Sequence, residues 1–86
     1  MVVLSDEVYE ALTFDGEEHI HFASIGNNFE RTVSIFSAGK LLCATGWKIG
    51  WAIAPEKLIK LGLVINSNIF YCFNSPGQVA VARALD

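Results

Sequence analysis

A lysine directly after a predicted strand is the residue with the clearest chemical potential. Residues Thr32–Phe36 read T-V-S-I-F, which is typical of a buried strand, and the loop S-A-G-K then ends at Lys40. A desolvated lysine amine at the carboxyl end of a strand can attack a carbonyl carbon, although a lone lysine in a loop is more often simply solvated. A phosphate-binding P-loop is excluded, because Ser34 replaces the first glycine of that motif and Leu41 follows the lysine in place of Ser or Thr.

Two other polar motifs lie at predicted strand ends. The apolar run Val2–Leu4 ends at Ser5 and Asp6 and leads into D-E-V-Y, and the motif T-G-W-K-I-G-W opens a third strand. Ligands of open α/β sheets bind at the edge where strands end. We therefore expect the three motifs to converge on one edge of a sheet.

The spacing of these elements predicts an α/β chain with a mixed sheet. The third strand is predicted at Trp47–Ala54, after a linker of ten residues, Ser37–Gly46. A parallel crossover needs a dozen or more residues, so the third strand should run antiparallel to the second. Residues Glu7–Phe14 are weakly helical, and we expect an irregular crossover from there to the second strand.

Two helices should follow the strands. Pro55 suits a first helical position, and Glu56 and Lys60 form an i, i+4 pair in the favourable order. Apolar residues surround most of this first helix, which predicts deep burial. The sequence Ser75–Gln78 reads S-P-G-Q, a capping box with serine as N-cap, and opens a second apolar helix. Since that helix is still periodic at Asp86, residues 1–86 are predicted to be a single partial domain.

Composition limits the classes of partner. The net charge of −3 and the isoelectric point near 5.2 provide no basic surface for nucleic acid or an anionic membrane. The uncharged stretch Leu61–Phe73 is interrupted by polar residues and is shorter than the roughly 18 residues of a membrane span. No signal peptide is recognisable at the amino terminus, so we expect a cytoplasmic location, with the mitochondrion as the alternative.

The size of the chain predicts marginal stability. An 86-residue domain of 9.4 kDa should fold to a surface of about 5,000 Å². The apolar area that it buries is then nearly offset by the conformational entropy of ordering the chain. With 52% hydrophobic and 17% charged residues, the chain should expose apolar faces that favour self-association.

As an ordered set, the motifs resemble a known enzyme family. The set comprises D-E-V-Y from Asp6, S-A-G-K ending at Lys40 and A-T-G-W-K-I-G-W from Ala44. It resembles the class I/II aminotransferases of the fold-type-I pyridoxal phosphate (PLP) superfamily, and is most similar to the group of kynurenine aminotransferases, glutamine transaminases and cysteine-S-conjugate β-lyases. The whole chain resembles the middle of their large domain, which implies a partial mixed sheet with flanking helices.

This resemblance implies a role for five residues around pyridoxal 5′-phosphate. Lys40 would attach covalently to the cofactor and later move a proton at the substrate α-carbon. Asp6 would pair with the pyridine nitrogen and Tyr9 would hydrogen-bond the O3′ oxygen of the ring. Ser37 and Lys48 would contact the phosphate; lysine at the latter position is common in the kynurenine-type group, whereas many other relatives have arginine.

The resemblance also implies substrates and an assembly. The substrates would be an amino acid and a 2-oxo acid, with Tyr71 and Asn74 as candidate substrate contacts, and the parent enzyme would be a homodimer. Transamination and β-elimination both stay open. The group usually reads K-T-F-S after the lysine, whereas Leu41–Cys43 here lacks two of those hydroxyl groups. Because other family segments that complete the site are absent, we expect the isolated chain to be inactive; the alternative is a truncated, non-catalytic interaction module.

Without the resemblance, each site residue has a structural interpretation. Asp6 could cap a helix, Tyr9 could pack on an apolar surface, and Lys48 could extend from an edge strand. Trp47 and Trp51 are four residues apart in the predicted strand, so they should share a face and pack in the core.

The histidines and cysteines suggest no cofactor chemistry by themselves. His19 and His21 could offer two metal ligands, but no third ligand lies near them in sequence, so no metal site is predicted. The spacing of Cys43 and Cys72 fits neither a zinc site nor a disulfide framework. They are predicted to be buried small side chains, because no basic neighbour or histidine partner indicates a reactive thiol.

Overall fold

The computed structural model describes residues 1–86 and contains a three-stranded mixed sheet in the order β1-β2-β3. Strand β1 (Val3–Asp6) pairs in parallel with β2 (Thr32–Ser37), and β3 (Gly50–Ile53) pairs antiparallel with β2. The predicted α/β class, the mixed sheet and the antiparallel third strand are therefore confirmed.

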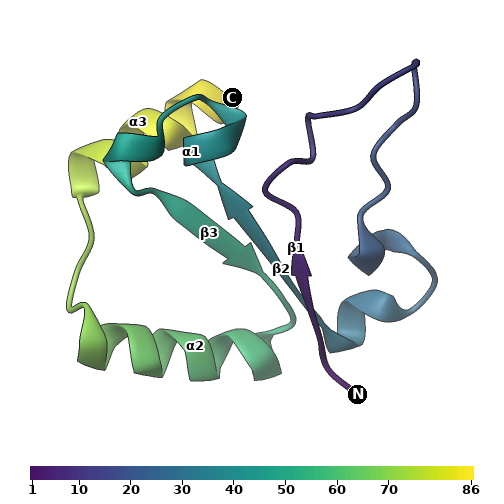
Figure 1. Ribbon diagram of the computed structural model, residues 1–86. Helices are drawn as coiled ribbons and strands as arrows, with labels where there is room; N and C mark the ends of the chain where they lie inside the picture. The colour runs from purple at the N-terminus through teal and green to yellow at the C-terminus, as the bar shows by residue number, and fades with distance from the viewer.

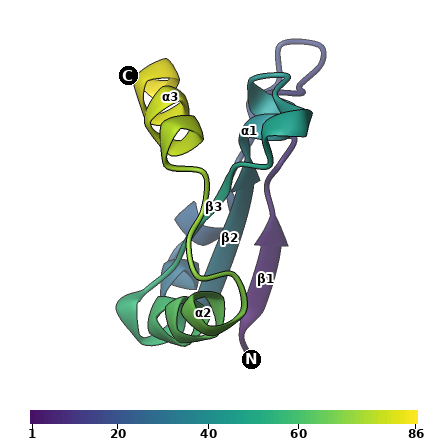
Figure 2. The ribbon, with the colours of Figure 1, turned by 90° about the vertical axis from the view of Figure 1, so that its left-hand side faces the viewer.

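The helices lie at the two ends of the strands. Figures 1 and 2 show helix α2 (Glu56–Ile69) at one end, and the one-turn α1 (Ala38–Leu41) with α3 (Ser75–Leu85) at the other. Strands β1 and β2 both point toward α1, so their carboxyl ends meet at that end of the molecule. The segment between β1 and β2 contains only turns and two 3₁₀ turns, Phe22–Ser24 and Asn28–Arg31. It is the irregular crossover that the sequence predicts, although the weakly helical part forms turns and no helix.

The third strand is shorter than its sequence predicts. Trp47 lies in a 3₁₀ turn, Thr45–Trp47, and Lys48 follows it in the left-handed region with φ 57°. A residue in that conformation cannot continue a strand, so β3 begins only at Gly50. Two predictions are therefore wrong: Trp47 and Trp51 do not share a strand face, and Lys48 does not extend from an edge strand.

Only one of the two tryptophans packs against the sheet. Trp51 lies opposite Phe36 in the β2–β3 pair, and the two rings stack with centroids 5.7 Å apart. Trp47 is 64% exposed. Its turn is instead held by hydrogen bonds to the chain around α1, such as the one from the Thr45 hydroxyl to the Gly39 carbonyl at 2.8 Å.

Both longer helices form where the sequence predicts them, but their first residues differ. Pro55 is the N-cap of α2 and not its first helical residue, and the predicted pair of Lys60 Nζ and Glu56 Oε1 is present at 2.6 Å. Helix α3 begins one residue earlier than expected. Its N-cap is Asn74, whose Oδ1 accepts a hydrogen bond from Gly77 N–H at 3.0 Å, so the predicted serine-based capping box is wrong.

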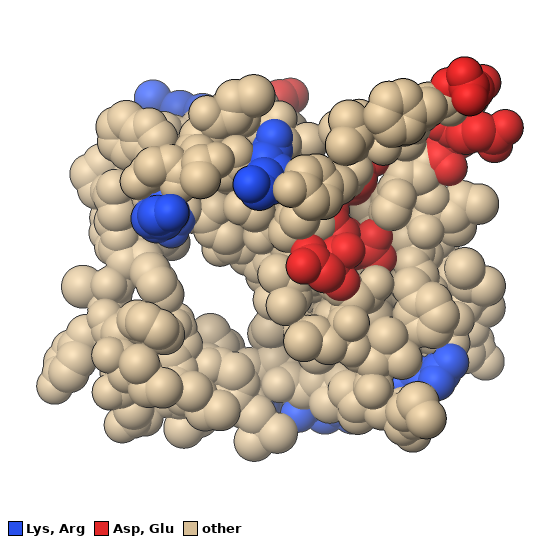
Figure 3. Space-filling view, viewed as in Figure 1, with Lys and Arg blue, Asp and Glu red and all other residues tan.

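Burial is much lower than the sequence predicts. Only seven of 86 residues are buried, and α2 contains none of them, so its predicted deep burial is wrong. A cavity of about 720 Å³ separates α2 from β2 and β3, and Figure 3 shows an opening on this side of the molecule. Cys43 and Cys72 are exposed free thiols, against the prediction of burial. Those predictions assumed that other segments cover these apolar surfaces, and no other segment of these 86 residues does so.

The small core lies along β2. Phe36, Ala38 and Ile49 are its buried apolar residues, and Thr32 and Ser34 extend the same alternating face of the strand. None of the helices reaches the length and apolar character that a membrane crossing requires.

Candidate cofactor site at the carboxyl ends of the strands

The predicted site residues Asp6 and Ser37 end neighbouring parallel strands. Asp6 is the last residue of β1 and pairs with Ile35, two residues before Ser37 at the end of β2. The Asp6 carboxylate accepts a hydrogen bond from Val8 N–H at 3.3 Å through Oδ1. The alternative in which Asp6 caps a helix finds no support, because residues 7–14 form no helix.

Lys40 and Tyr9 lie close together at this edge. The Lys40 amine is 5.8 Å from the centroid of the Tyr9 ring, within the range of a cation–π contact. Both residues line a cavity of about 460 Å³, together with Leu12, Gly39 and Thr45 among others. Tyr9 is 59% exposed, so packing in a core does not explain its position. Lys40 is also exposed, so this chain alone does not desolvate the amine.

The pairing of β2 and β3 relates Ser37 to the segment that directly follows Lys48. Ser37 pairs with Gly50, and Ala38 N–H donates to the Ile49 carbonyl at 3.1 Å, which brings the residue after Lys48 against the start of α1. The Ser37 side chain caps α1 by accepting from Gly39 N–H at 3.1 Å. Its hydroxyl hydrogen stays available to a further acceptor.

The two candidate substrate contacts lie on the link between α2 and α3. Tyr71 is 90% exposed and has φ 62°, and no hydrogen bond or ring contact ties it to the other site residues. Asn74 is the N-cap of α3, so its side-chain oxygen already has a structural partner. Phe73, between them, lines a small cavity of about 80 Å³ with Lys48.

A buried carboxylate beside this edge was not singled out by the sequence. Glu7 is 4% exposed and accepts hydrogen bonds from Ser5 Oγ at 2.7 Å and from Phe22 N–H at 3.3 Å, and it contacts His19 Nε2 at 2.5 Å. Burial is the largest influence on this carboxyl and opposes its ionisation. The hydrogen bonds and the charge of His19 together outweigh burial, and they hold the pKa of Glu7 below its ordinary value of 4.5.

Glu7 has no sequence signal of its own, because its partners His19 and Phe22 lie 12 to 15 residues further along an aperiodic segment. The one available hint is the spacing of His19 and His21, which predicts neighbouring side chains without indicating what they face. His21 Nδ1 lies 3.6 Å from Glu7 Oε2. The structure thus supplies the third ligand-type residue that the sequence did not show beside the histidines.

Comparison with known proteins shows which family the chain matches. The model of the family "Aminotransferase class I and II" matches residues 1–86. The chain is 50% identical to kynurenine–oxoglutarate transaminase of Dictyostelium discoideum, an alignment that covers 98% of the chain and 19% of the relative. It is 46% identical to kynurenine–oxoglutarate transaminase 3 of Mus musculus, over 94% of the chain and 18% of that relative.

A solved structure shows the same arrangement. The structure of N-succinyldiaminopimelate aminotransferase from Mycobacterium tuberculosis superposes with a TM-score of 0.95 at 45% identity, over 100% of this chain and 22% of that one. The chain therefore spans about a fifth of the length of the relatives that it matches. With a family model matched along its entire length, and with its three-stranded mixed sheet reproduced in a solved relative, the chain belongs to the class I and II aminotransferases.

Proposed function

We propose that residues 1–86 are a single partial domain that supplies one wall of the cofactor site of a PLP-dependent aminotransferase. The reaction would move an amino group from an amino acid of the kynurenine or glutamine type to a 2-oxo acid. The observation that carries this proposal is the position of the Lys40 amine over the Tyr9 ring, in a cavity at the edge where β1 and β2 end. The names of the similar transaminases support the substrate class.

The donor and acceptor groups at this edge fit pyridoxal phosphate. The accessible amine of Lys40 can react with the cofactor aldehyde, and the phenol of Tyr9 can hydrogen-bond the ring oxygen O3′. Asp6 has one carboxylate oxygen free of hydrogen bonds, which suits a pyridine nitrogen. Ser37 and Lys48 offer a hydroxyl donor and a positive charge to the phosphate.

Each of these residues has a task in the reaction. Bound pyridoxal phosphate supplies an electron sink for the negative charge that develops at the substrate α-carbon. Lys40 holds the cofactor before substrate arrives and afterwards carries a proton to and from that carbon. Asp6 and Tyr9 orient the ring, and Ser37 with Lys48 holds its phosphate end. The left-handed backbone of Lys48 is an unusual conformation of the kind that concentrates at functional sites.

The complete reaction would be carried out by the parent enzyme and not by the isolated chain. The site is open and its lysine is exposed, so water is not excluded from the reacting atoms. We expect no turnover by the 86 residues alone, and a homodimer for the parent. Transamination and β-elimination remain alternative outcomes of the same chemistry, Tyr71 and Asn74 remain candidate substrate contacts, and the cytoplasm or the mitochondrion remains the expected location.

The proposal is tested by trapping the cofactor on the chain. The purified protein is mixed with pyridoxal phosphate and reduced with borohydride, and the added phosphopyridoxyl mass is located by peptide mapping. Lys40→Arg is the matched control, because it keeps the positive charge and cannot form the covalent link. We expect the label on Lys40 in the unaltered chain and its loss in the variant.

The distribution of the label decides between the two functions. Selective label on Lys40 supports the cofactor site. Even label over Lys40, Lys48, Lys57 and Lys60 would contradict a formed site in this chain. That result would favour the alternative of a non-catalytic interaction module, which the unusually open surface of the chain supports.

A further inference from the structure

The buried carboxylate of Glu7 and the imidazoles of His19 and His21 form a compact cluster on the crossover side of the sheet. Glu7 directly follows β1, and its N–H donates to the Ile35 carbonyl of β2 at 2.9 Å. The two histidines come from the crossover, and their ring centroids are 4.7 Å apart. One carboxylate oxygen and one nitrogen from each histidine all lie within 4.8 Å of one another.

The surroundings of Glu7 orient its carboxylate. Oε1 accepts the hydrogen bonds from Ser5 Oγ at 2.7 Å and from Phe22 N–H at 3.3 Å. Oε2 is left facing both histidines, at 2.5 Å from His19 Nε2 and 3.6 Å from His21 Nδ1. Outer hydrogen bonds of this kind fix a carboxylate in the orientation that a metal ligand requires.

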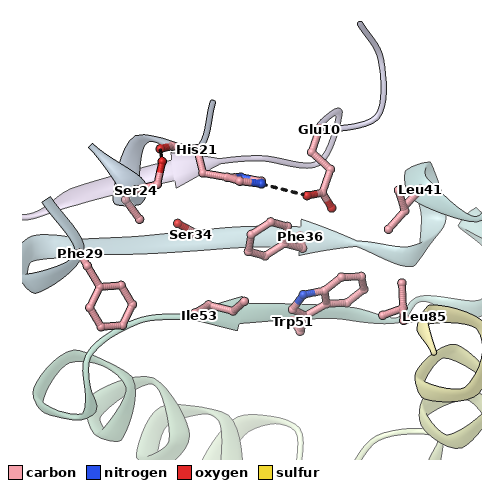
Figure 4. A pocket seen from close by; sticks show the side chains of 11 residues that line it. Glu10, His21, Ser24, Phe29, Ser34, Phe36, Leu41, Trp51, Ile53 and Leu85 are labelled. Carbon is pink, nitrogen blue, oxygen red and sulfur yellow. Dashed lines mark hydrogen bonds and ion pairs between the residues drawn. The ribbon is translucent and has the colours of Figure 1, made fainter. Parts of the chain in front are cut away.

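The Nδ1 atom of His21 is buried and makes no hydrogen bond, which is unfavourable for a polar atom removed from water. Its Nε2 atom lies 3.4 Å from Glu10 Oε2, and Figure 4 shows the ring extending toward that carboxylate across Phe36. A carboxylate on the far nitrogen is the outer partner that metal-bound histidines usually have, and it would leave Nδ1 as the nitrogen with a free lone pair.

We propose that Glu7 Oε2, His19 Nε2 and His21 Nδ1 bind one divalent transition-metal ion of the Zn²⁺ class. Two imidazoles and a carboxylate are a donor set that zinc uses, with a fourth position for water. Bonds of about 2.0–2.1 Å in a tetrahedral site separate the donors by roughly 3.3 Å. The Glu7–His21 separation of 3.6 Å already suits this geometry, and the Glu7–His19 pair would open by less than 1 Å from 2.5 Å. The two histidine nitrogens, which lie within 4.8 Å of each other, would close to the same separation.

The site would join the end of β1 to the crossover. The histidine side chains are 33% and 39% exposed, so an ion can reach the cluster from solvent. Since Glu7 adjoins Asp6, the bound ion would hold that strand end in place. This inference does not depend on the proposed cofactor site, because its ligands are separate from Lys40, Tyr9 and Ser37.

The test is a zinc titration of the chelator-treated chain, with a chromophoric chelator as competitor. Because Cys43 and Cys72 are exposed thiols that could also bind zinc, both are first replaced by serine. We expect one ion per chain. His21→Gln should weaken binding at least tenfold, whereas Glu18→Gln, which alters an exposed carboxylate beside His19 that forms no ion pair, should leave binding unchanged.

His21→Gln is the decisive variant because it leaves the hydrogen bonds among Ser5, Glu7 and His19 in place. Circular dichroism of each variant establishes that it is folded. Substituting Co²⁺ for zinc gives a second readout, since tetrahedral coordination by nitrogen and oxygen produces visible absorption bands without the thiolate charge-transfer band. Failure to bind, or equal binding by the His21→Gln variant, would overturn the proposal.

Discussion

At the scale of single residues, Glu7 is the side chain whose ionisation matters most to the fold. It is the one buried acidic residue, and Ser5, His19 and the backbone at Phe22 hold its charged form. The Asp6 carboxylate, which is proposed to contact the cofactor, is by contrast exposed at the sheet edge. Glu7 therefore supports the structure beside the proposed cofactor site, because it directly follows Asp6.

We predict that Glu7 makes stability depend on pH. The folded pKa of Glu7 lies below 4.5, so its stabilisation is complete above about pH 4.5 and is lost as the pH falls through the lower folded value. In chelator, Glu7→Gln should lower the free energy of unfolding by about 1.5–3 kcal/mol at pH 7, as expected for hydrogen bonds to a charged group.

Urea unfolding between pH 7 and pH 3 measures this effect. The difference between the unaltered chain and Glu7→Gln should shrink below pH 4.5, and Glu18→Gln should track the unaltered chain. A difference that stays constant down to pH 3 would show that the charge of Glu7 contributes nothing.

At the scale of elements, the pairing of β2 and β3 sets Gly50 opposite Ser37, two residues after Lys48, and Gly50 permits this pairing. A Cβ atom on Gly50 would lie 2.9 Å from the Phe36 carbonyl oxygen, which is too close without a backbone shift. Gly62, in the middle of α2, has no atom within 4 Å of its Cβ position. The two glycines thus form a matched pair, one constrained by tertiary contact and one not.

We predict opposite effects of alanine at these two positions. Gly50→Ala should destabilise the chain by about 1–3 kcal/mol, because the two strands must separate. Gly62→Ala should stabilise it by about 0.5–1 kcal/mol, because alanine favours a helix interior. Denaturant unfolding of both variants provides the comparison, and a Gly50→Ala chain as stable as Gly62→Ala would contradict the close approach of β3 to β2.

At the scale of the whole molecule, the surface is larger than a self-sufficient domain of this size would expose. The accessible area is 6634 Å², against the roughly 5,000 Å² expected from the mass. The radius of gyration is 14.1 Å, against about 12 Å for a compact chain of 86 residues. Many large apolar side chains are exposed, among them Leu61, Val64 and Ile65 of α2.

We predict that these faces make the chain self-associate as its concentration rises. Ile65→Glu should weaken association by about tenfold or more, because burying an isoleucine contributes about 1.5–3 kcal/mol. Ser67→Glu adds the same charge at an exposed polar position of α2 and should change association less. Sedimentation velocity over a concentration series measures this, and a purely monomeric chain would show that the apolar faces remain solvated.

The sequence by itself determined the strands, the longer helices and the residues at the strand ends. Local β-branched runs and the ten-residue linker were sufficient to predict the mixed sheet, because these signals act between near neighbours. The ordered motifs around Asp6, Lys40 and Lys48 were sufficient to identify the family. The roles assigned to those residues remain predictions that follow from it.

Only the tertiary structure decided which side chains are buried and which meet across the crossover. Periodicity predicted a buried α2, and the two cysteines were also predicted to be buried. Burial depends on which other segments cover a face, and most of these faces are uncovered. The left-handed turn at Lys48 moved the start of the third strand from the predicted Trp47 to Gly50. Glu7 meets His19 and His21 through an aperiodic segment whose path is set by backbone turns and by packing on β2, and no spacing rule encodes that path.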